Sequence, residues 1–274
     1  MTGTDKYLEE LKWQRDEITR QQHEIIQSIR YASLIQSSLL PPESLIQKLL
    51  PAGFILFKPR DIVSGDFYWM AEKDEKIYLA VADCTGHGVP GALMSILGIS
   101  FLNEILARGE SYRANRILNL LREMVMKSLH QTGDVSQSMD GMDIALCIYD
   151  AANKTMQYAG ANNPLFMVRK DVLTEFKPDR MPIGISGHEE HSFKNHFFDV
   201  RKGDWFYLFS DGYVDQFGGQ NGKKFKYDPF KSVLLEIAGK KAPDQKEKLD
   251  HTLEKWMGKY SQVDDILVMG ARFD

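Results

Sequence analysis

Acidic residues stand at the ends of four apolar, strand-like runs, beside or close to glycine. Asp66 follows Gly65 and precedes FYWM, Asp83 ends IYLAVAD, Asp211 ends DWFYLFSD, and Asp264-Asp265 open DDILVMG. A single carboxylate at a strand end is most often a turn residue or a cap. Four such positions are a stronger signal, because strands that pair in one sheet can bring their ends to one edge. We therefore expect these carboxylates to share one space.

Clustered carboxylates repel each other unless a cation lies between them, and hard oxygen ligands select Mg²⁺ or Mn²⁺ over Zn²⁺. The pattern thus predicts a metal site. Two such ions about 4 Å apart lower the pKa of a bridging water and clamp the oxygens of an in-line phosphoryl displacement. The expected activity is hydrolysis of a phosphate ester.

Two further residues are candidates for proton transfer to the substrate or for binding its phosphate. His87 lies in the glycine loop after Asp83, where a general acid for the leaving oxygen would be useful, although a histidine packed within its loop explains the residue equally well. Arg60 precedes Asp66 closely enough to offer a guanidinium fork to phosphate. An arginine at a strand end is usually solvated, so both alternatives stay open.

The elements that must position these residues begin at Gly53. Short β-type runs, several of them separated by turn residues, continue to the end of the chain, which favours antiparallel hairpins. Helical stretches are expected at 92–108, 114–130, 228–238 and 244–258. Strands in meandering groups with helices inserted in blocks predict an α+β fold of packed sheets flanked by helices.

The preceding segment, 5–40, contains neither glycine nor proline and is expected to be one long helix that ends at Pro41-Pro42. One side of a heptad seam is apolar and the other is mixed. The seam positions are Leu11, Ile18, Ile25, Ala32 and Leu39 on the first side, and Leu8, Arg15, Gln22, Ile29 and Gln36 on the second. This pattern predicts a coiled-coil connector that dimerises weakly. The alternative is an amphipathic helix lying on its own domain. We expect a connector at 1–42 and a catalytic domain at 43–274.

Composition excludes several classes of protein. With 43% hydrophobic and 26% charged residues and a net charge of −4, the chain is an ordinary globular protein with no basic field for nucleic acid. Cys84 and Cys147 show no CxxC spacing, which indicates a reducing, cytoplasmic compartment. The uncharged run 84–103 is interpreted as a loop and a buried helix rather than a membrane span. No signal peptide or membrane segment is expected, and a piece of a larger sensor would look the same.

The ordered motifs PRDIVSGDFYW, VADCTGHGVPGALMS, GDWFYLFSDGYVD and VDDILV resemble those of the metal-dependent PPM (2C-like) protein phosphatases, in the bacterial SpoIIE-like branch of serine/threonine phosphatases. The resemblance covers about 50–273 and extends into the lead-in IRYASLIQSSLLPP. It implies a β-sandwich of two antiparallel sheets flanked by helices, here preceded by the long N-terminal helix. One departure is Asn162, which stands where many members carry a histidine.

The resemblance also implies a role for each acidic position. Asp66 and Asp83 would hold two Mn²⁺ or Mg²⁺ ions, with Asp83 bridging them and the backbone carbonyl of Cys84 as a further ligand. Asp211 would bind one ion from the opposite sheet. The last ligand would be Asp264, with Asp265 as the alternative. A metal-activated hydroxide, rather than a side chain, would attack phosphorus.

The implied substrate is a phosphoserine or phosphothreonine on a partner-switching protein, such as a STAS-domain anti-sigma-factor antagonist. The expected assembly is a homodimer through the N-terminal helix, which would regulate the enzyme. A second hypothesis is a catalytically weak signalling scaffold that uses the phosphatase fold and the coiled coil only to bind partners.

Overall fold

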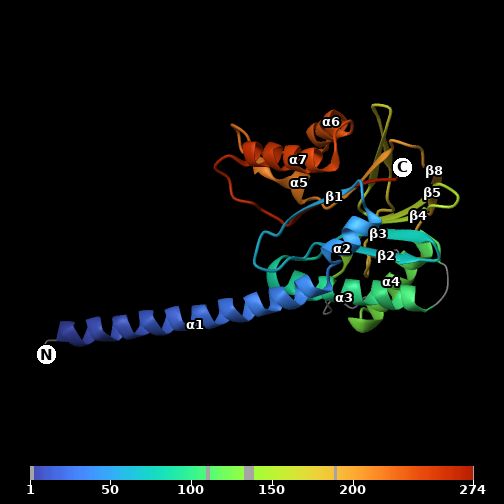
Figure 1. Cartoon of the computed structure of the whole chain (residues 1–274). Helices are drawn as coiled ribbons and strands as arrows, with labels where there is room; N and C mark the ends of the chain where they lie inside the picture. Colours follow the sequence, from blue (N-terminus) through green and yellow to red (C-terminus); the bar gives the residue numbers. More distant parts are fainter. Residues whose placement is uncertain (1–2, 109–111, 133–138, 188–189, 274) are drawn as a thin grey trace.

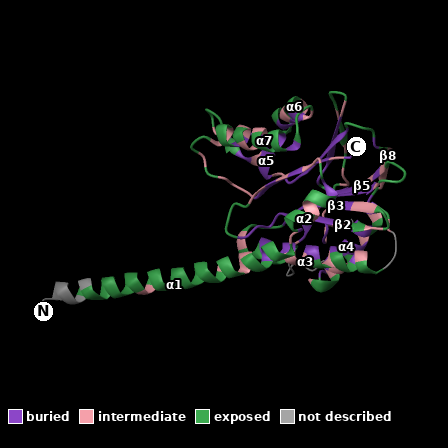
Figure 2. Ribbon diagram, in the orientation of Figure 1, coloured by how far each residue is buried: buried purple, intermediate pink, exposed green. Residues whose placement is uncertain are grey.

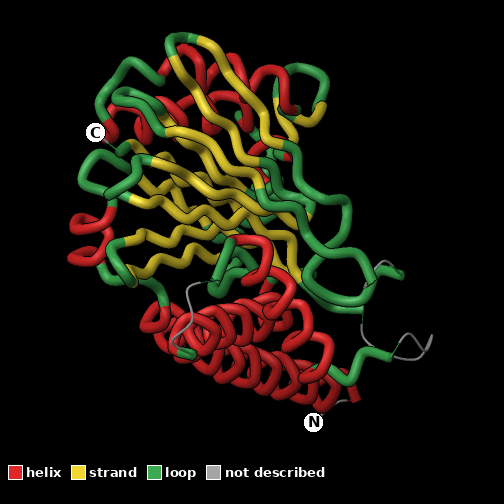
Figure 3. Tube along the Cα trace, turned by 90° about the vertical axis from the view of Figure 1, so that its right-hand side faces the viewer, coloured by secondary structure: helices red, strands yellow, loops and turns green. Residues whose placement is uncertain are grey.

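Two five-stranded antiparallel sheets pack face to face at the centre of the molecule, as Figure 3 shows from the side. The computed structural model describes residues 3–108, 112–132, 139–187 and 190–273. The sheet that we call the β9 sheet has, in order, β1 (Phe54–Lys58), β12 (Ile266–Arg272), β9 (Trp205–Phe209), β6 (Leu165–Arg169) and β7 (Val172–Phe176). The β3 sheet has β2 (Phe67–Lys73), β3 (Lys76–Cys84), β4 (Met142–Asp150), β5 (Thr155–Ala161) and β8 (His196–Asp199).

Helices cover the outer face of each sheet, so that four layers form (Figure 1). On the β3 sheet lie α3 (Gly88–Ala107) and α4 (Ala114–Ser128), and on the β9 sheet lie α6 (Tyr227–Ile237) and α7 (Ala242–Met257). Each of the four helices expected in the domain is found, with its ends within four residues of the expected ones. The α+β sandwich predicted from the strand and helix pattern is therefore confirmed.

Several short elements were not expected from the sequence. They are α2 (Glu43–Leu49), α5 (Gly212–Asp215), the edge strand β7 and the two-residue strands β10 (Phe217–Gly218) and β11 (Lys223–Lys224). The helices and the two-residue strands are too short to show a period of their own, and β7 is mostly exposed and lacks an apolar run.

Strand β3 is packed on both of its faces. Leu79 and Val81 point into the space between the two sheets, whereas Tyr78, Ala80 and Ala82 pack beneath α3 and α4. Successive side chains of a strand point to opposite faces, and both faces are covered here, so the strand is apolar throughout. Figure 2 shows these central strands as the buried part of the molecule. Because both faces of the sheet are covered, a carboxylate that follows such an apolar run is expected at the end of the sheet.

Helix α3 is long and apolar enough to cross a membrane by length and composition, with a mean hydropathy of 1.6 in its most apolar window. In the folded chain its residues Ile99, Leu102 and Ile105 are buried in the apolar cluster that α3 forms with α4 and the outer face of the β3 sheet. This position agrees with the interpretation of the run 84–103 as a loop that leads into a buried helix.

Helix α1 (Gly3–Leu39) leaves the domain as a single long rod (Figure 1), as the absence of glycine and proline predicted. The side chains of Leu11, Ile18 and Ile25 are 44%, 55% and 59% exposed along it. The heptad pattern assigned Gln36 to the dimer seam, but this side chain is buried against the chain's own domain. The last turns of α1 therefore lie on the chain's own domain, as the second interpretation predicted, and the coiled-coil connector stays a prediction for the exposed length.

Candidate active site at one edge of the sandwich

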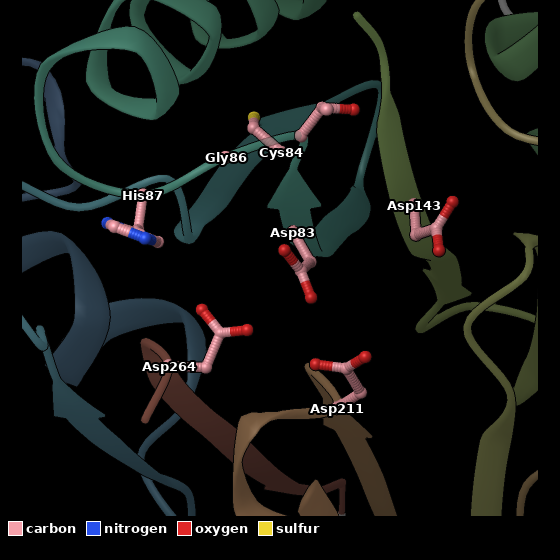
Figure 4. Close-up of a pocket in the computed structure, with 8 residues that line it drawn as sticks. Asp83, Cys84, Gly86, His87, Asp143, Asp211 and Asp264 are labelled. Atoms are coloured by element: carbon pink, nitrogen blue, oxygen red, sulfur yellow. The ribbon is translucent and has the colours of Figure 1, made fainter. Parts of the chain in front are cut away.

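Acidic side chains from both sheets line one cavity of about 230 Å³ (Figure 4). Asp83 comes from the end of β3, Asp211 follows β9 and Asp264 precedes β12. The loop from Cys84 to His87 completes one wall. The structure thus brings together three of the strand-end carboxylates that the sequence singled out.

The pairing of strands determines this convergence. Ser210 donates its backbone N–H to the carbonyl of Leu267 at 3.0 Å, and its hydroxyl accepts the N–H of Leu267 at 3.1 Å. The start of β12 and the turn after β9 are therefore held side by side. A Cβ at Gly212 would lie 1.9 Å from the carbonyl oxygen of Asp265, so only glycine allows Asp211 to turn into α5 this close to β12.

Asp66 lies beneath the cavity rather than in its wall. It is 2% exposed and accepts a hydrogen bond of 2.5 Å from the Ser210 hydroxyl. Its own N–H donates to the hydroxyl of Ser64 at 3.1 Å. A buried carboxylate with a single side-chain donor has oxygen lone pairs left over for another ligand.

The structure separates the two members of the acidic pair before β12. Asp264 lines the cavity, whereas Asp265 is 3% exposed and is not part of its wall. The carboxylate of Asp265 accepts the backbone N–H of Arg60 and that of Gly65, each at 2.7 Å. Asp265 therefore ties the 60–65 loop to β12, and each of its oxygens already accepts one backbone N–H.

The Cys84 thiol is buried, and burial together with the charge of Asp83 raises its pKa well above its usual range. The thiol therefore stays protonated in the metal-free protein. Its backbone carbonyl oxygen lies 3.2 Å from the point where a Cβ at Gly65 would stand. The carbonyl thus faces the loop that precedes Asp66, which only a glycine allows to come so near.

His87 lines the cavity and is half exposed. Its Nδ1 lies 3.2 Å from the carboxylate of Asp61, which orients the ring. Arg60 is exposed and is not part of the cavity wall, and its guanidinium donates to the carbonyl of Val263 at 3.0 Å. The structure therefore brings His87 to the site and places Arg60 at its rim.

Burial and mutual repulsion dominate the electrostatics of the cluster. Burial raises the pKa of Asp211 to about 6, and the charges of Asp215 and Asp264 add to the effect. The pKa of Asp83 lies well above its usual range because of burial, then because of Asp66 and Asp211. For Asp66, burial raises the pKa and the Ser210 hydrogen bond opposes this in part. The cluster favours either protons or a cation.

Sequence reasoning missed three residues of the site. Asp143 lines the cavity and stands directly opposite Asp83 in the β3–β4 register. Asn162 donates its side-chain amide to Asp143 at 2.8 Å, and Ser210 donates to Asp66. The sequence did contain a signal for Asp143, since it opens the run DIALCIYD as Asp264 and Asp265 open DDILVMG. That Asp143 lies opposite Asp83 depends on the pairing of the strands.

The donor set fits a pair of hard divalent cations. Carboxylate and carbonyl oxygens surround the cavity, and burial makes their ionised forms costly unless a cation is near. The described residues contain no group of three His, Cys, Asp or Glu side chains placed to ligate one ion. The fit therefore rests on the chemistry of the oxygen donors.

Comparisons with known proteins identify relatives of this chain. The family model described as Stage II sporulation protein E (SpoIIE) matches residues 73–274. The phosphoserine phosphatase RsbU of Bacillus subtilis (strain 168) is 26% identical over 200 residues, which are 71% of this chain and 55% of RsbU. The chain thus spans about half the length of this curated relative.

Solved structures show the same fold. The SiaA-PP2C domain of Pseudomonas aeruginosa superposes with a TM-score of 0.84 at 34% identity, over 92% of this chain and 98% of that one. RsbX, solved in complex with magnesium, shares the fold with a TM-score of 0.56 at 13% identity, over 81% of this chain and 94% of that one. The chain belongs to the SpoIIE family of PP2C-type serine/threonine phosphatases.

Proposed function

We propose that this chain hydrolyses phosphoserine or phosphothreonine on a signalling protein, with two Mn²⁺ or Mg²⁺ ions. The observation that carries the proposal is the convergence of Asp83, Asp211 and Asp264, from both sheets, on one cavity above the buried Asp66. The name of RsbU as a phosphoserine phosphatase supports the choice of substrate chemistry.

Four carboxylates and one carbonyl would hold the ions. Asp66, Asp83, Asp211 and Asp264 supply the charge, and the Cys84 carbonyl supplies a neutral oxygen. RsbX, which shares the fold, was solved in complex with magnesium, and this supports the choice of a divalent cation. The ions would supply an activated water and neutralise the oxygens of the phosphate. Asp265 is left out of the set because it does not line the cavity and each of its oxygens accepts a backbone N–H of the 60–65 loop.

The remaining residues position these groups and the substrate. Ser210 and Ser64 hold Asp66 from both sides, and Asp265 fixes the loop that precedes it. The contact between His87 Nδ1 and Asp61 leaves Nε2 as the atom that would give a proton to the leaving serine oxygen. Arg60 stands at the rim, where its guanidinium would meet phosphate only after leaving the Val263 carbonyl.

We propose a STAS-domain anti-sigma-factor antagonist or a similar partner-switching protein as the substrate, by likeness to RsbU. Two buried, free cysteines, Cys84 and Cys147, support a reducing, cytoplasmic location.

Regulation through α1 completes the proposal, with a connector at 1–42 and the catalytic domain at 43–274. The exposed stripe of Leu11, Ile18 and Ile25 offers a seam for a second copy of the chain. The side chain of Gln36 reaches the backbone of Ser64, two residues from Asp66. Pairing of two α1 helices would therefore act on the metal ligands through this contact and through the neighbouring Cys84 carbonyl.

The proposal is tested by release of phosphate from a phosphoserine peptide, with and without Mn²⁺. We expect metal-dependent turnover that Asp211→Asn abolishes. Turnover that is absent with metal, or unchanged in Asp211→Asn, would show that the proposal is wrong. Calorimetric titration with Mn²⁺ separates the scaffold alternative, because a pure binding platform should lack a tight divalent-metal site.

A further inference from the structure

A second feature of the surface lies at the edge of the β9 sheet away from the acidic cavity. Two cavities of about 270 and 320 Å³ adjoin each other there and share Gly239 in their walls. They are formed by the β6–β7 turn, the loop before β9 and the connection from α6 to α7. We call their cationic residues the basic edge: Arg169, Lys170, Arg201, Lys202, Lys240, Lys241 and Arg272.

The charge of the basic edge is opposite to that of the rest of the protein. Seven cations and two carboxylates, Asp171 and Asp204, line the two cavities, which gives this surface a formal charge of +5. The whole chain carries −4, so everything outside the edge carries −9. A local excess of one sign against this background attracts ligands of the other sign.

Among the described residues, most of these cations make no side-chain hydrogen bond or ion pair, although the charge of Lys240 acts on Glu236. Arg169 is paired with Asp204, with bonds of 2.8 and 2.5 Å. In the part of the chain that the structure describes, no hydrogen bond or ion pair engages the exposed side chains of Lys170, Arg201, Lys202, Lys240 and Lys241. Other lysines on the surface do pair with acids, as Lys231 does with Glu175. The five cations are therefore available to an external ligand.

The backbone beneath these side chains is held in place. Asp204 is 1% exposed, and besides Arg169 it accepts the backbone N–H of Arg201 at 2.7 Å. Arg169 also donates to the carbonyl of Asp199 at 2.7 Å. One partly buried ion pair thus links the end of β6 to the loop before β9, so little ordering of the backbone is required when a ligand binds.

The basic edge is remote from the acidic cavity. Trp205 at the start of β9 lies in the wall of one basic cavity, and Asp211 beyond the other end of β9 lines the acidic one. Six residues of extended chain span about 20 Å. A ligand on the basic edge therefore leaves the acidic cavity open.

We propose that the basic edge docks a short acidic segment of a partner protein. A short segment matches the extent of two adjoining cavities. Nucleic acid or an anionic membrane would extend beyond the edge and meet the rest of the protein, whose net charge is negative and repels it. This inference does not rest on the phosphatase activity, because it concerns a separate surface.

Fluorescence anisotropy with a labelled peptide of about eight glutamates tests the proposal on the full chain. We expect binding at about 0.05 M salt that weakens about tenfold or more at about 0.5 M, because exposed charges are screened. The variant Lys170→Glu/Arg201→Glu/Lys202→Glu should lose about tenfold or more in affinity. The matched control Lys127→Glu/Lys177→Glu/Lys255→Glu changes the net charge equally at exposed sites elsewhere and should bind as the parent does.

Unchanged thermal unfolding of the triple variant shows that it is folded. Absence of binding at low salt, or an equal loss in the control, would overturn the proposal. Two further results would overturn it. One is displacement of the peptide by inorganic phosphate at a concentration that supplies the same total negative charge as the peptide. The other is binding of vesicles with anionic lipid through the same three residues while the peptide does not bind. Hydrolysis of p-nitrophenyl phosphate should be the same with and without the peptide, so the outcome is independent of the proposed catalysis.

Discussion

Gln36 of α1 donates its side-chain amide to the carbonyl of Ser64 at 2.6 Å and accepts the N–H of the same residue at 3.1 Å. The amide also donates to the hydroxyl of Ser95 on α3 at 2.7 Å. One side chain thus satisfies both backbone groups of a buried residue that directly precedes Gly65 and Asp66. The last turns of α1 are therefore joined to the catalytic loop by a contact that cannot be lost without cost.

The variant Gln36→Ala tests this contact. It leaves the buried N–H and carbonyl of Ser64 unpaired, which should lower the free energy of unfolding by about 1–3 kcal/mol. The affinity for Mn²⁺ should fall as well, because the backbone before Asp66 is released. Thermal denaturation and calorimetry give the two readouts. The control is Gln27→Ala, since Gln27 is exposed on the same helix and contacts only His23. Equal effects of the two variants would contradict the prediction.

The two members of the acidic pair should respond in opposite ways to amidation. Asp265→Asn replaces one acceptor by a donor facing a backbone N–H, so we expect a loss of about 1–3 kcal/mol in the free energy of unfolding. Asp264→Asn removes a charge from a repelling cluster and should leave the metal-free protein as stable or more stable, while Mn²⁺ affinity falls. Denaturant unfolding and metal titration separate the two. A destabilised Asp264→Asn with normal metal affinity would reverse the assignment.

The metal-free protein should become more stable as the pH is lowered from about 7 to about 4. The pKa of Asp211 is raised from 3.8 to about 6, so in this window the folded state binds more protons than the unfolded state. The free energy of unfolding therefore falls as the pH rises, by up to about 3 kcal/mol for this group. Denaturant unfolding at several pH values measures the slope. Asp211→Asn should flatten it, and an equal slope in that variant would exclude Asp211 as the source.

Asn162→Gly removes the amide that bonds to Asp143 without straining the backbone, because residue 162 has a φ of 55°. Burial already raises the pKa of Asp143, and the Asn162 hydrogen bond opposes that rise. Its loss should move the acid limb of the pH–rate profile upward by roughly one pH unit. The variant Asn153→Gly, which instead loses a side-chain hydrogen bond to Asp150, outside the cavity, should keep the parental profile. A shift in both variants, or in neither, would contradict a role for Asn162.

Local pattern was enough to predict much of the fold. Strands such as IYLAVAD are apolar because both faces of their sheet are covered, and α4 begins where the sequence placed it, at Ala114. The strand-end acids could be predicted for the same reason. A carboxylate is rarely buried, so one that borders a buried strand is expected at the end of that strand.

Tertiary structure decided how the individual side chains are used. The sequence by itself determined that acids of the right type stand at the ends of buried strands and that a long helix precedes them. It could not show that Asp265 is tied to Gly65, which lies 200 residues earlier in the chain, or that Gln36 pairs with Ser64. Nor could it place Asp143 opposite Asp83. The burial and the hydrogen-bond partners of a side chain depend on which distant segments come into contact. Short-range periodicity of the sequence contains no information about those contacts.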